Sequence, residues 1–216
     1  MSSISSKIKS GWQKSFLFRM VEKHINNKCR ISLKNDSFTI LCPNCIGGCI
    51  YHRLGKKFLS PTINMWMTQP DFVKFLLHLD EYLSEQLKFV ESNDTTPTAK
   101  LGRNTLPEII LHFNHANSNQ EADKQWNDRK TRINRDNLYV ILYYLDGITE
   151  NELHLLDDNP CRNKIVLTST KLPTVTWSKY IKKPKFGQYP DSYLGRDVFG
   201  VRHYEKKWDY IDFINS

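Results

Sequence analysis

Three short runs of the chain are apolar at nearly every position. They are EIILHF at residues 108–113, LYVILYY at residues 138–144 and KIVLT at residues 164–168. Uninterrupted apolar runs of this length, rather than alternating ones, are typical of strands that are covered on both faces. In residues 31–44 the turn residues Asn35-Asp36-Ser37 separate two short apolar runs, which predicts a strand, a turn and a second strand at residues 38–41.

Between these runs the apolar residues recur every three or four positions, which is the period of a helix. The predicted helices cover residues 72–90, 119–133, 149–157 and 204–214. The third of them starts at Thr149, and Glu152 stands at the spacing of a capping box. Residues 61–67 are expected to be extended, residues 92–105 to form a loop, and residues 171–200 to be irregular, because proline, glycine and polar residues interrupt them.

Buried strands that alternate with helices predict the α/β class. We expect a three-layer α/β/α domain with a mostly parallel sheet at residues 36–216, preceded by a separate N-terminal helix at residues 1–35. In open sheets of this kind, ligands bind at the carboxyl ends of the strands. This rule predicts one rim, formed by residues 44–45, 112–115, 145–146 and 168–170.

The N-terminal segment is basic and amphipathic. Before Asp36, eight lysines and arginines face only one acidic residue, Glu22. Its apolar side recurs at Ile8, Trp12, Phe16, Met20 and His24 or Ile25. Such a helix can lie on an anionic membrane surface; the alternative is a helix that packs on the domain with its lysines in water. Because no zinc finger, helix-turn-helix or RNA-recognition signature accompanies the charge, nucleic acid is not an expected partner.

The composition adds two points to this picture. With 39% hydrophobic residues, a chain of 216 residues can bury a core, whereas no apolar run approaches the roughly 20 residues needed to span a bilayer. No secretory signal is recognisable and the five cysteines are an odd number, so reduced thiols in the cytoplasm are expected. The predicted location is therefore the cytoplasm, at the inner face of the cell membrane if the basic helix binds lipid.

The strand predicted at residues 38–41 leads into Asn44 and Cys45, and a Gly-Gly pair, Gly47 and Gly48, follows. A thiol between a strand and a short helix is a common way to present a nucleophile, because the helix N-terminus lowers the thiol pKa. The glycine N–H groups can bind a phosphate or an oxyanion. Asn44, the two glycines and Tyr51 are candidate substrate contacts. In the alternative interpretation, Cys45 is a small buried residue and the glycines form a turn.

A cysteine nucleophile needs a base. His115 is the first candidate, because it follows the strand EIILHF at the predicted rim. His112 is expected to point into a layer of the domain and is kept as a candidate substrate contact. Asp146, after LYVILYY, is a further candidate for a base, although Asp-Gly is also a common turn. In the alternative, His115 is a hydrogen-bonded residue at a strand end.

The spacing of Cys42 and Cys45, with Cys49 four residues on, also invites a metal or dithiol interpretation. Zinc needs four ligands, and the sequence lacks a second paired cluster of cysteine and histidine. We therefore predict no metal and no cofactor, and a redox-active dithiol is the weaker alternative.

Trp126, Arg129 and Arg132 are spaced three residues apart and share one face of a predicted helix, which Asn134 follows. The forked guanidinium of arginine suits a phosphate or a carboxylate, such as that of a sugar nucleotide or a lipid-linked pyrophosphate. All four residues are candidate substrate contacts. Alternatively, Trp126 packs on the sheet and the arginines pair with acidic residues of the same helix.

Several segments resemble a bacterial family known as a domain of unknown function, number 1919, whose members are often named exopolysaccharide or capsular polysaccharide biosynthesis proteins. The resemblance rests on NCIGGCIYHRLG (44–55), SPTINMWM (60–67), DFVKFLLHLDEYL (71–83), HFNHANSNQEADKQWNDRKTRIN (112–134), DG (146–147) and NKIVLT (163–168). It covers most of the chain after residue 37. Cys45 matches the cysteine of the family pattern, whereas a small residue such as serine is more usual where this chain has Cys42. The resemblance implies a role in making surface polysaccharide, without an established reaction.

The resemblance and the candidate site together predict a transferase of surface-polysaccharide assembly that acts on a sugar nucleotide or a lipid-linked sugar. Cys45 is the expected nucleophile or acid/base, His115 its partner, and Arg129 and Arg132 the phosphate or carboxylate binders. Two alternatives stay open. One is a non-catalytic accessory protein that binds a sugar nucleotide or an assembly partner. The other is a Cys-dependent hydrolase or esterase, which uses water rather than an acceptor sugar.

Overall fold

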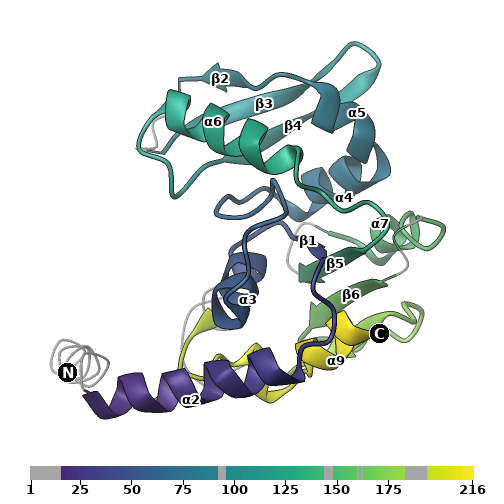
Figure 1. Cartoon of the computed structure of the whole chain (residues 1–216). Coiled ribbons are helices and arrows are strands. Elements are labelled where there is room, and N and C mark those ends of the chain that lie inside the picture. The colour runs from purple at the N-terminus through teal and green to yellow at the C-terminus, as the bar shows by residue number, and fades with distance from the viewer. Residues whose placement is uncertain (1–15, 92–95, 144–147, 160, 162, 183–193) are drawn as a thin grey trace, which may run out of the picture. The chain divides into compact units, whose positions relative to one another are not determined.

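The computed structural model describes residues 16–91, 96–143, 148–159, 161, 163–182 and 194–216. The chain forms two compact units, whose elements are labelled in Figure 1. Residues 37–51 and 57–180 form the sheet unit, and residues 1–36, 52–56 and 181–216 form the terminal unit. The first and the last segments of the chain therefore belong to the same unit.

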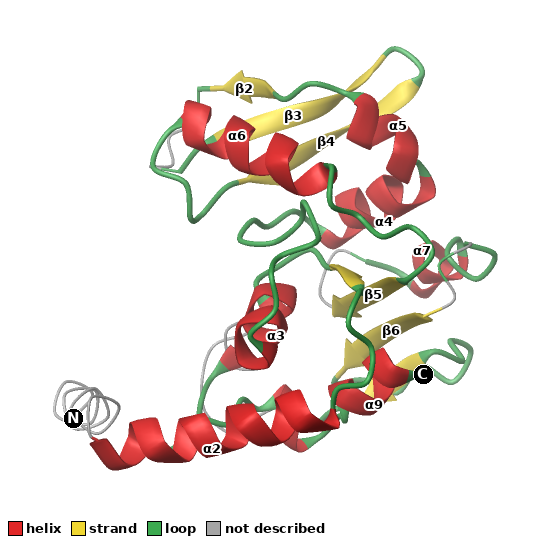
Figure 2. Cartoon of the chain, in the orientation of Figure 1, coloured by secondary structure: helices red, strands yellow, loops and turns green. Residues whose placement is uncertain are grey.

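The first sheet of the sheet unit is parallel (Figure 2). Within the described residues its strands are β1 (Thr39–Leu41), β5 (Leu138–Tyr143), β6 (Asn163–Thr168) and β7 (Ser178–Tyr180), in the order β1-β5-β6-β7. Each neighbouring pair runs in the same direction, with Leu41 beside Val140 and Ile141 beside Ile165. The apolar residues of β5 and β6 are largely buried, as their uninterrupted apolar runs predicted. The α/β class with a mostly parallel sheet and an N-terminal helix is confirmed.

A second, antiparallel sheet corrects two predictions. Its strands are β2 (Lys88–Val90), β3 (Thr98–Arg103) and β4 (Leu106–His112), in the order β2-β3-β4. The run at residues 108–113 belongs to this sheet and not to the parallel one, and the loop predicted at residues 92–105 contains β3. The reason is local: Arg103 pairs with Leu106 across a two-residue connection, so a hairpin forms. Gly102, with a φ of +135°, lies where the pairing register of β3 shifts between Leu101 and Arg103. This glycine is one of the residues that led to the prediction of a loop.

Among the described residues, the helices wholly within the sheet unit are α4 (Gln69–Leu77), α5 (Leu79–Ser84), α6 (Asn119–Lys130) and α7 (Glu150–His154). The Thr68 hydroxyl accepts the Asp71 N–H at 3.2 Å and caps α4. The predicted capping box of Thr149 and Glu152 is confirmed at the start of α7. The single helix predicted at residues 72–90 is wrong, because it breaks at His78 and its last three residues form β2.

Aromatic side chains fill the core of the sheet unit. In Figure 1, α6 crosses the antiparallel sheet, while α4 packs against β4 and α7. Phe72, Phe75, Tyr82 and Trp126 are buried there. The ring centroid of Phe75 lies 5.9 Å from that of Tyr82 and 6.3 Å from that of Trp126. Removing such large apolar surfaces from water is the dominant stabilising contribution to this unit.

The terminal unit contains α2 (Phe16–Ser32), a 3-10 turn η1 (Tyr204–Lys206) and α9 (Tyr210–Asn215). The first of the two strands predicted in residues 31–44 is wrong, because Ile31 and Ser32 end α2. The helix predicted at residues 204–214 is divided, because α9 starts afresh after Asp209, whose carboxylate accepts two N–H groups of the first turn at 3.0 Å. At the other end of α9, the Asn215 side chain donates to the Ser32 carbonyl at 2.9 Å. No helix in the described ranges combines the length and the apolar character that a membrane crossing requires.

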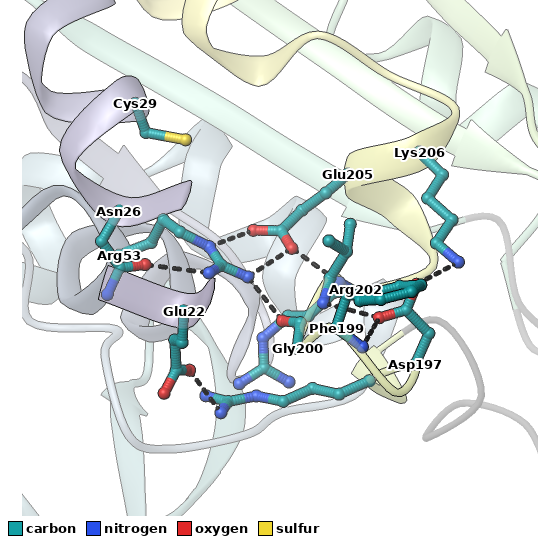
Figure 3. A network of polar contacts seen from close by, with 12 residues as sticks. Glu22, Asn26, Cys29, Arg53, Asp197, Phe199, Gly200, Arg202, Glu205 and Lys206 are labelled. Carbon is teal, nitrogen blue, oxygen red and sulfur yellow. Dashed lines mark hydrogen bonds and ion pairs between the residues drawn. The ribbon is translucent and has the colours of Figure 1, made fainter. Parts of the chain in front are cut away.

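A buried guanidinium organises the terminal unit (Figure 3). Arg53 lies in the last turn of α3 (Ile46–Leu54), is only 4% exposed and binds Glu205 through hydrogen bonds of 2.7 and 2.6 Å. The same guanidinium donates to the Asn26 side chain at 2.9 Å and to the Gly200 carbonyl at 2.8 Å. Because a buried charge is tolerated only while its partners are in place, Arg53 holds α2 against residues 200–205.

Candidate functional site

The structure brings together Cys45 and His115, which are 70 residues apart in the sequence. The distance between Cys45 Sγ and His115 Nε2 is 3.8 Å. Cys45 follows β1 and is half-buried, whereas His115 follows β4 and is exposed. The two residues come from different sheets, so the prediction of one shared rim on a parallel sheet is wrong although the pair itself is close. A sulfur and an imidazole nitrogen at this separation can exchange a proton.

Local hydrogen bonds place Cys45 at the N-terminus of α3. The Asn44 side chain accepts the Ile46 N–H at 3.0 Å, and the Cys45 carbonyl accepts the Cys49 N–H at 3.0 Å. Asn44 is therefore a capping residue, which satisfies one of the free donors of the first turn. The positive end of the helix dipole lies at Cys45 and stabilises negative charge there. The thiol of Cys45 thus has two neighbours, the N-terminal end of α3 and the imidazole of His115.

Gly47 and Gly48 lie in the first turn of α3 and not in a separate turn. A Cβ atom on Gly47 would lie 2.8 Å from both Cys42 Sγ and Ile63 Cδ1, and one on Gly48 would lie 3.1 Å from Asn64 Oδ1. Contacts this short leave no room for a side chain. Close packing of the helix against β1 and residues 63–64 is therefore a sufficient reason for both glycines.

Cys42 differs from Cys45 in its surroundings. It is fully buried, and burial raises the pKa of its thiol to about 12, against the opposing effect of hydrogen bonds from the backbone of Gly47 and Asn44. The Cys42 thiol is thus uncharged at neutral pH. The five cysteines are free thiols, and the described part of the chain holds no group of three or more side chains suited to a metal ion.

Three predicted substrate contacts serve the fold instead. Trp126 is 1% exposed and packs in the core. Tyr51 is equally buried, and its hydroxyl donates to the Phe38 carbonyl at 2.8 Å and accepts the Ile40 N–H at 3.1 Å, so it braces β1. The Asn134 side chain donates to the carbonyl and the hydroxyl of Ser37 at 2.9 and 3.0 Å. Sequence spacing alone does not distinguish such buried or bracing residues from residues that contact a ligand.

Of the two candidate arginines, Arg129 is held by hydrogen bonds from its side chain, and Arg132 is its charged neighbour. Arg129 donates to the Ile63 carbonyl at 2.7 Å and to the Gln125 side chain at 2.8 Å, and it lies 5.8 Å from the centre of the Phe58 ring. Desolvation, followed by the nearby charge of Arg132, lowers the pKa of Arg129. Among the described residues no carboxylate forms an ion pair with either arginine. The alternative, in which these arginines form ion pairs with acidic residues of the helix, is therefore not found, although the charge of Asp128 acts on Arg129.

Trp66 is a residue that the sequence interpretation missed. Its ring stacks on that of His112, with centroids 3.9 Å apart and planes inclined by 6°. Two backbone hydrogen bonds of 2.9 Å join the same residues, and Met67 donates to the Pro43 carbonyl at 3.1 Å, two positions before Cys45. The indole is 37% exposed, and since His112 covers one face, the other is open. Residues 61–64 form a turn rather than the expected extended segment, and beyond it the buried Met65 and Met67 stand on either side of the exposed Trp66. This alternation is the signal that points Trp66 outward.

Two further observations complete the description of the site. Asp146 lies outside the described residues. A cavity of about 400 Å³ in the sheet unit is lined by His78, Glu81, Arg135, Leu138 and Cys161, among others. Leu138 begins β5, Cys161 shortly precedes β6 and Leu41 ends β1, so this cavity extends from the amino ends of β5 and β6 to the end of β1.

Comparison with known proteins gives two consistent results. Residues 17–215 match the model of a domain of unknown function, DUF1919. A relative from Haemophilus influenzae, described as an uncharacterized protein, is 32% identical over 210 residues, which are 97% of this chain and 97% of the relative. A match over almost the whole length includes both compact units. The chain therefore belongs to the DUF1919 family.

Proposed function

We propose that the chain is a cysteine-dependent transferase of surface-polysaccharide assembly, which takes its donor from a sugar nucleotide or a lipid-linked sugar. The observation that carries the proposal is the distance of 3.8 Å between Cys45 Sγ and His115 Nε2. The assignment to polysaccharide rests on the resemblance to proteins named for that pathway, and the chemistry rests on the pair.

The proposed reaction has two steps. In the first, His115 accepts the thiol proton, Cys45 Sγ attacks the electrophilic carbon of the donor, and the phosphate leaves with the bonding electrons and the proton from the imidazolium. In the second, His115 accepts the proton of the acceptor hydroxyl, whose oxygen attacks the same carbon. The bond from carbon to sulfur breaks, and the thiolate recovers a proton from the imidazolium.

Neighbouring residues suit such a donor. The open face of Trp66 offers a flat apolar surface on which a sugar ring or a base can stack. Arg129 and Arg132 supply two neighbouring cationic charges, which favour a phosphate group. Arg129 is fixed to the backbone at Ile63, three residues before Trp66, so the stacking surface and one cation belong to the same part of the sheet unit.

The test is the rate of alkylation against pH, followed by intact mass, for the wild type, Cys45→Ala and His115→Asn. Cys49→Ala is the matched control, because Cys49 is a half-buried thiol one turn further along α3. We expect one fast site that disappears in Cys45→Ala, slows in His115→Asn and persists in Cys49→Ala. Incubation with sugar nucleotides should then give a covalent adduct only where Cys45 is present.

Two results would contradict the proposal. Slow labelling of the wild type, or fast labelling that persists in Cys45→Ala, would make Cys45 a structural residue and favour the non-catalytic binding protein. The second result is a covalent adduct that disappears at the same rate with and without an acceptor sugar. Water would then be the acceptor, which would favour a hydrolase.

A further inference from the structure

The helix α2 turns apolar side chains toward solvent. Its large exposed apolar residues are Phe16, Leu17, Met20 and Ile31, with exposed fractions of 75%, 61%, 53% and 85%. At 3.6 residues per turn these four positions fall within one side of the helix. The sequence placed Phe16 and Met20 on an apolar side that would either lie on a membrane surface or pack on the domain, and the structure turns this side outward.

The other side of α2 is fixed to the terminal unit by specific contacts (Figure 3). Glu22 forms an ion pair of 2.7 Å with Arg196, and Asn26 accepts a hydrogen bond from Arg53. Cys29 accepts a hydrogen bond from the Tyr210 hydroxyl at 3.4 Å. Phe18, only 4% exposed, lies on this side as well. Because these contacts determine the rotation of α2 about its axis, the apolar side is held outward.

Positive charge accompanies this apolar side. The terminal unit contains 17 lysines and arginines against 7 aspartates and glutamates, whereas the sheet unit contains 14 against 16. Arg19, Lys23 and Lys28 are exposed on α2 and flank the apolar side. Within the described ranges none of these three forms an ion pair. The net positive charge of the chain is thus confined to the unit that exposes the apolar side.

We propose that the outer side of α2 docks the terminal unit on an anionic phospholipid surface, with Phe16, Leu17, Met20 and Ile31 in the headgroup region. An amphipathic helix with basic flanks binds such a surface through apolar burial and through attraction to anionic lipids, and it does so without crossing the bilayer. A nucleic acid would use the charge, but the aliphatic side chains of Leu17, Met20 and Ile31 offer its bases no ring on which to stack. This docking is independent of the chemistry proposed for Cys45.

The test is co-sedimentation of the full chain with vesicles of phosphatidylcholine mixed with phosphatidylglycerol, and with vesicles of phosphatidylcholine alone. The variant combines Phe16→Gln, Leu17→Gln and Met20→Gln, since glutamine keeps helix propensity. Leu155→Gln is the control, because Leu155 is 57% exposed in the sheet unit. We expect binding to the mixed vesicles that falls about tenfold or more in the triple variant, is unchanged in Leu155→Gln and weakens with added salt.

Each of three results would overturn the proposal. The first is no binding of the wild type to the mixed vesicles. The second is equal binding of the wild type and the triple variant, which would reduce the interaction to charge alone. The third is equal binding to both kinds of vesicle, which would remove the role of anionic lipid. Circular dichroism of the triple variant checks that α2 is still folded.

Discussion

The two units are stabilised in different ways. The sheet unit buries aromatic side chains around Phe75 and Trp126, and it is close to neutral. The terminal unit is basic, and a buried ion pair of Arg53 with Glu205 joins its separate segments. The Cys45–His115 pair lies in the sheet unit, and the outward apolar side of α2 lies in the terminal unit. A substitution in the core should therefore cost most in the sheet unit, and the loss of a charged partner should cost most in the terminal unit.

The largest expected effect is that of Trp126→Ala in the sheet unit. Truncating a buried tryptophan removes its apolar contacts and leaves a cavity, so the free energy of unfolding should fall by about 4 kcal/mol. Chemical denaturation measures the loss, and hydrogen exchange should locate it in the sheet unit. Trp66→Ala is the control, because Trp66 is 37% exposed, and it should cost less than about 1.5 kcal/mol. Equal losses in the two variants would contradict the distinction between a core tryptophan and a surface one.

Glu205→Gln should have the next largest effect, and it should act in the terminal unit. The side chains of Arg53 and Glu205 are 5% and 7% exposed, so neutralising Glu205 leaves a buried cation without its counter-charge. We expect a loss of about 3 kcal/mol in the free energy of unfolding and faster hydrogen exchange in α2 and residues 200–206.

Glu108→Gln is the matched control for Glu205→Gln. Glu108 pairs with Lys100 at 2.8 Å, but the two side chains are 58% and 38% exposed. An exposed ion pair contributes little, so this variant should change the free energy of unfolding by less than about 1 kcal/mol. If the two variants lose the same free energy of unfolding, the stability of the terminal unit does not depend on the ion pair of Arg53 with Glu205.

The same contrast explains how much the sequence could predict. The strands β5 and β6 and the capping box at Thr149 follow from patterns within a few residues, and these predictions are confirmed. The pair of Arg53 and Glu205 joins residues 152 positions apart, and no local pattern marks either partner. The hairpin of β3 and β4 was missed because its turn lacks the glycine or asparagine-glycine pair that usually identifies one.

The sequence pointed to Cys45 and His115 but not to the arrangement that brings them together. Cys45 and His115 were selected as residue types that react together, and they lie 3.8 Å apart. The reasoning assumed one parallel sheet, whereas β1 and β4 belong to two sheets. Tyr51 was selected because it follows Cys45 closely, and Trp126 because it shares a helix face with two arginines, yet aromatic residues are also the largest core residues. Only burial, which depends on the whole fold, separates the two uses.

A smaller effect is expected for Gly200→Ala in the terminal unit. Gly200 has a φ of +79°, and a Cβ atom there would lie 3.1 Å from the ring of Phe18. The left-handed backbone and the close contact together should lower the free energy of unfolding by about 1–2 kcal/mol. The measurement is chemical denaturation with hydrogen exchange of α2. Gly195→Ala is the control, because Gly195 lies in the same segment without a positive φ, and it should leave the free energy of unfolding nearly unchanged. An equal loss in both variants would show that the positive φ of Gly200 and its contact with Phe18 are not the cause.

The smallest effect concerns the buried thiol of Cys42 at alkaline pH. Burial raises the pKa of this thiol from 9.0 to about 12. Below pH 9 both the folded and the unfolded state keep the proton, so the stabilising contribution is fully present. As the pH rises further, the unfolded thiol ionises first and the contribution is lost, by roughly 1 kcal/mol at one unit above the unfolded pKa.

The test compares the free energy of unfolding of the wild type and Cys42→Ala between about pH 8 and pH 10. The wild type should lose stability more steeply, because the variant lacks the thiol that ionises on unfolding, while other alkaline groups act equally in both. If the wild type and Cys42→Ala change in parallel, Cys42 ionises as readily in the folded chain as in the unfolded one. The CPNC segment would then present two accessible thiols, and the assignment of the chemistry to Cys45 alone would have to be withdrawn.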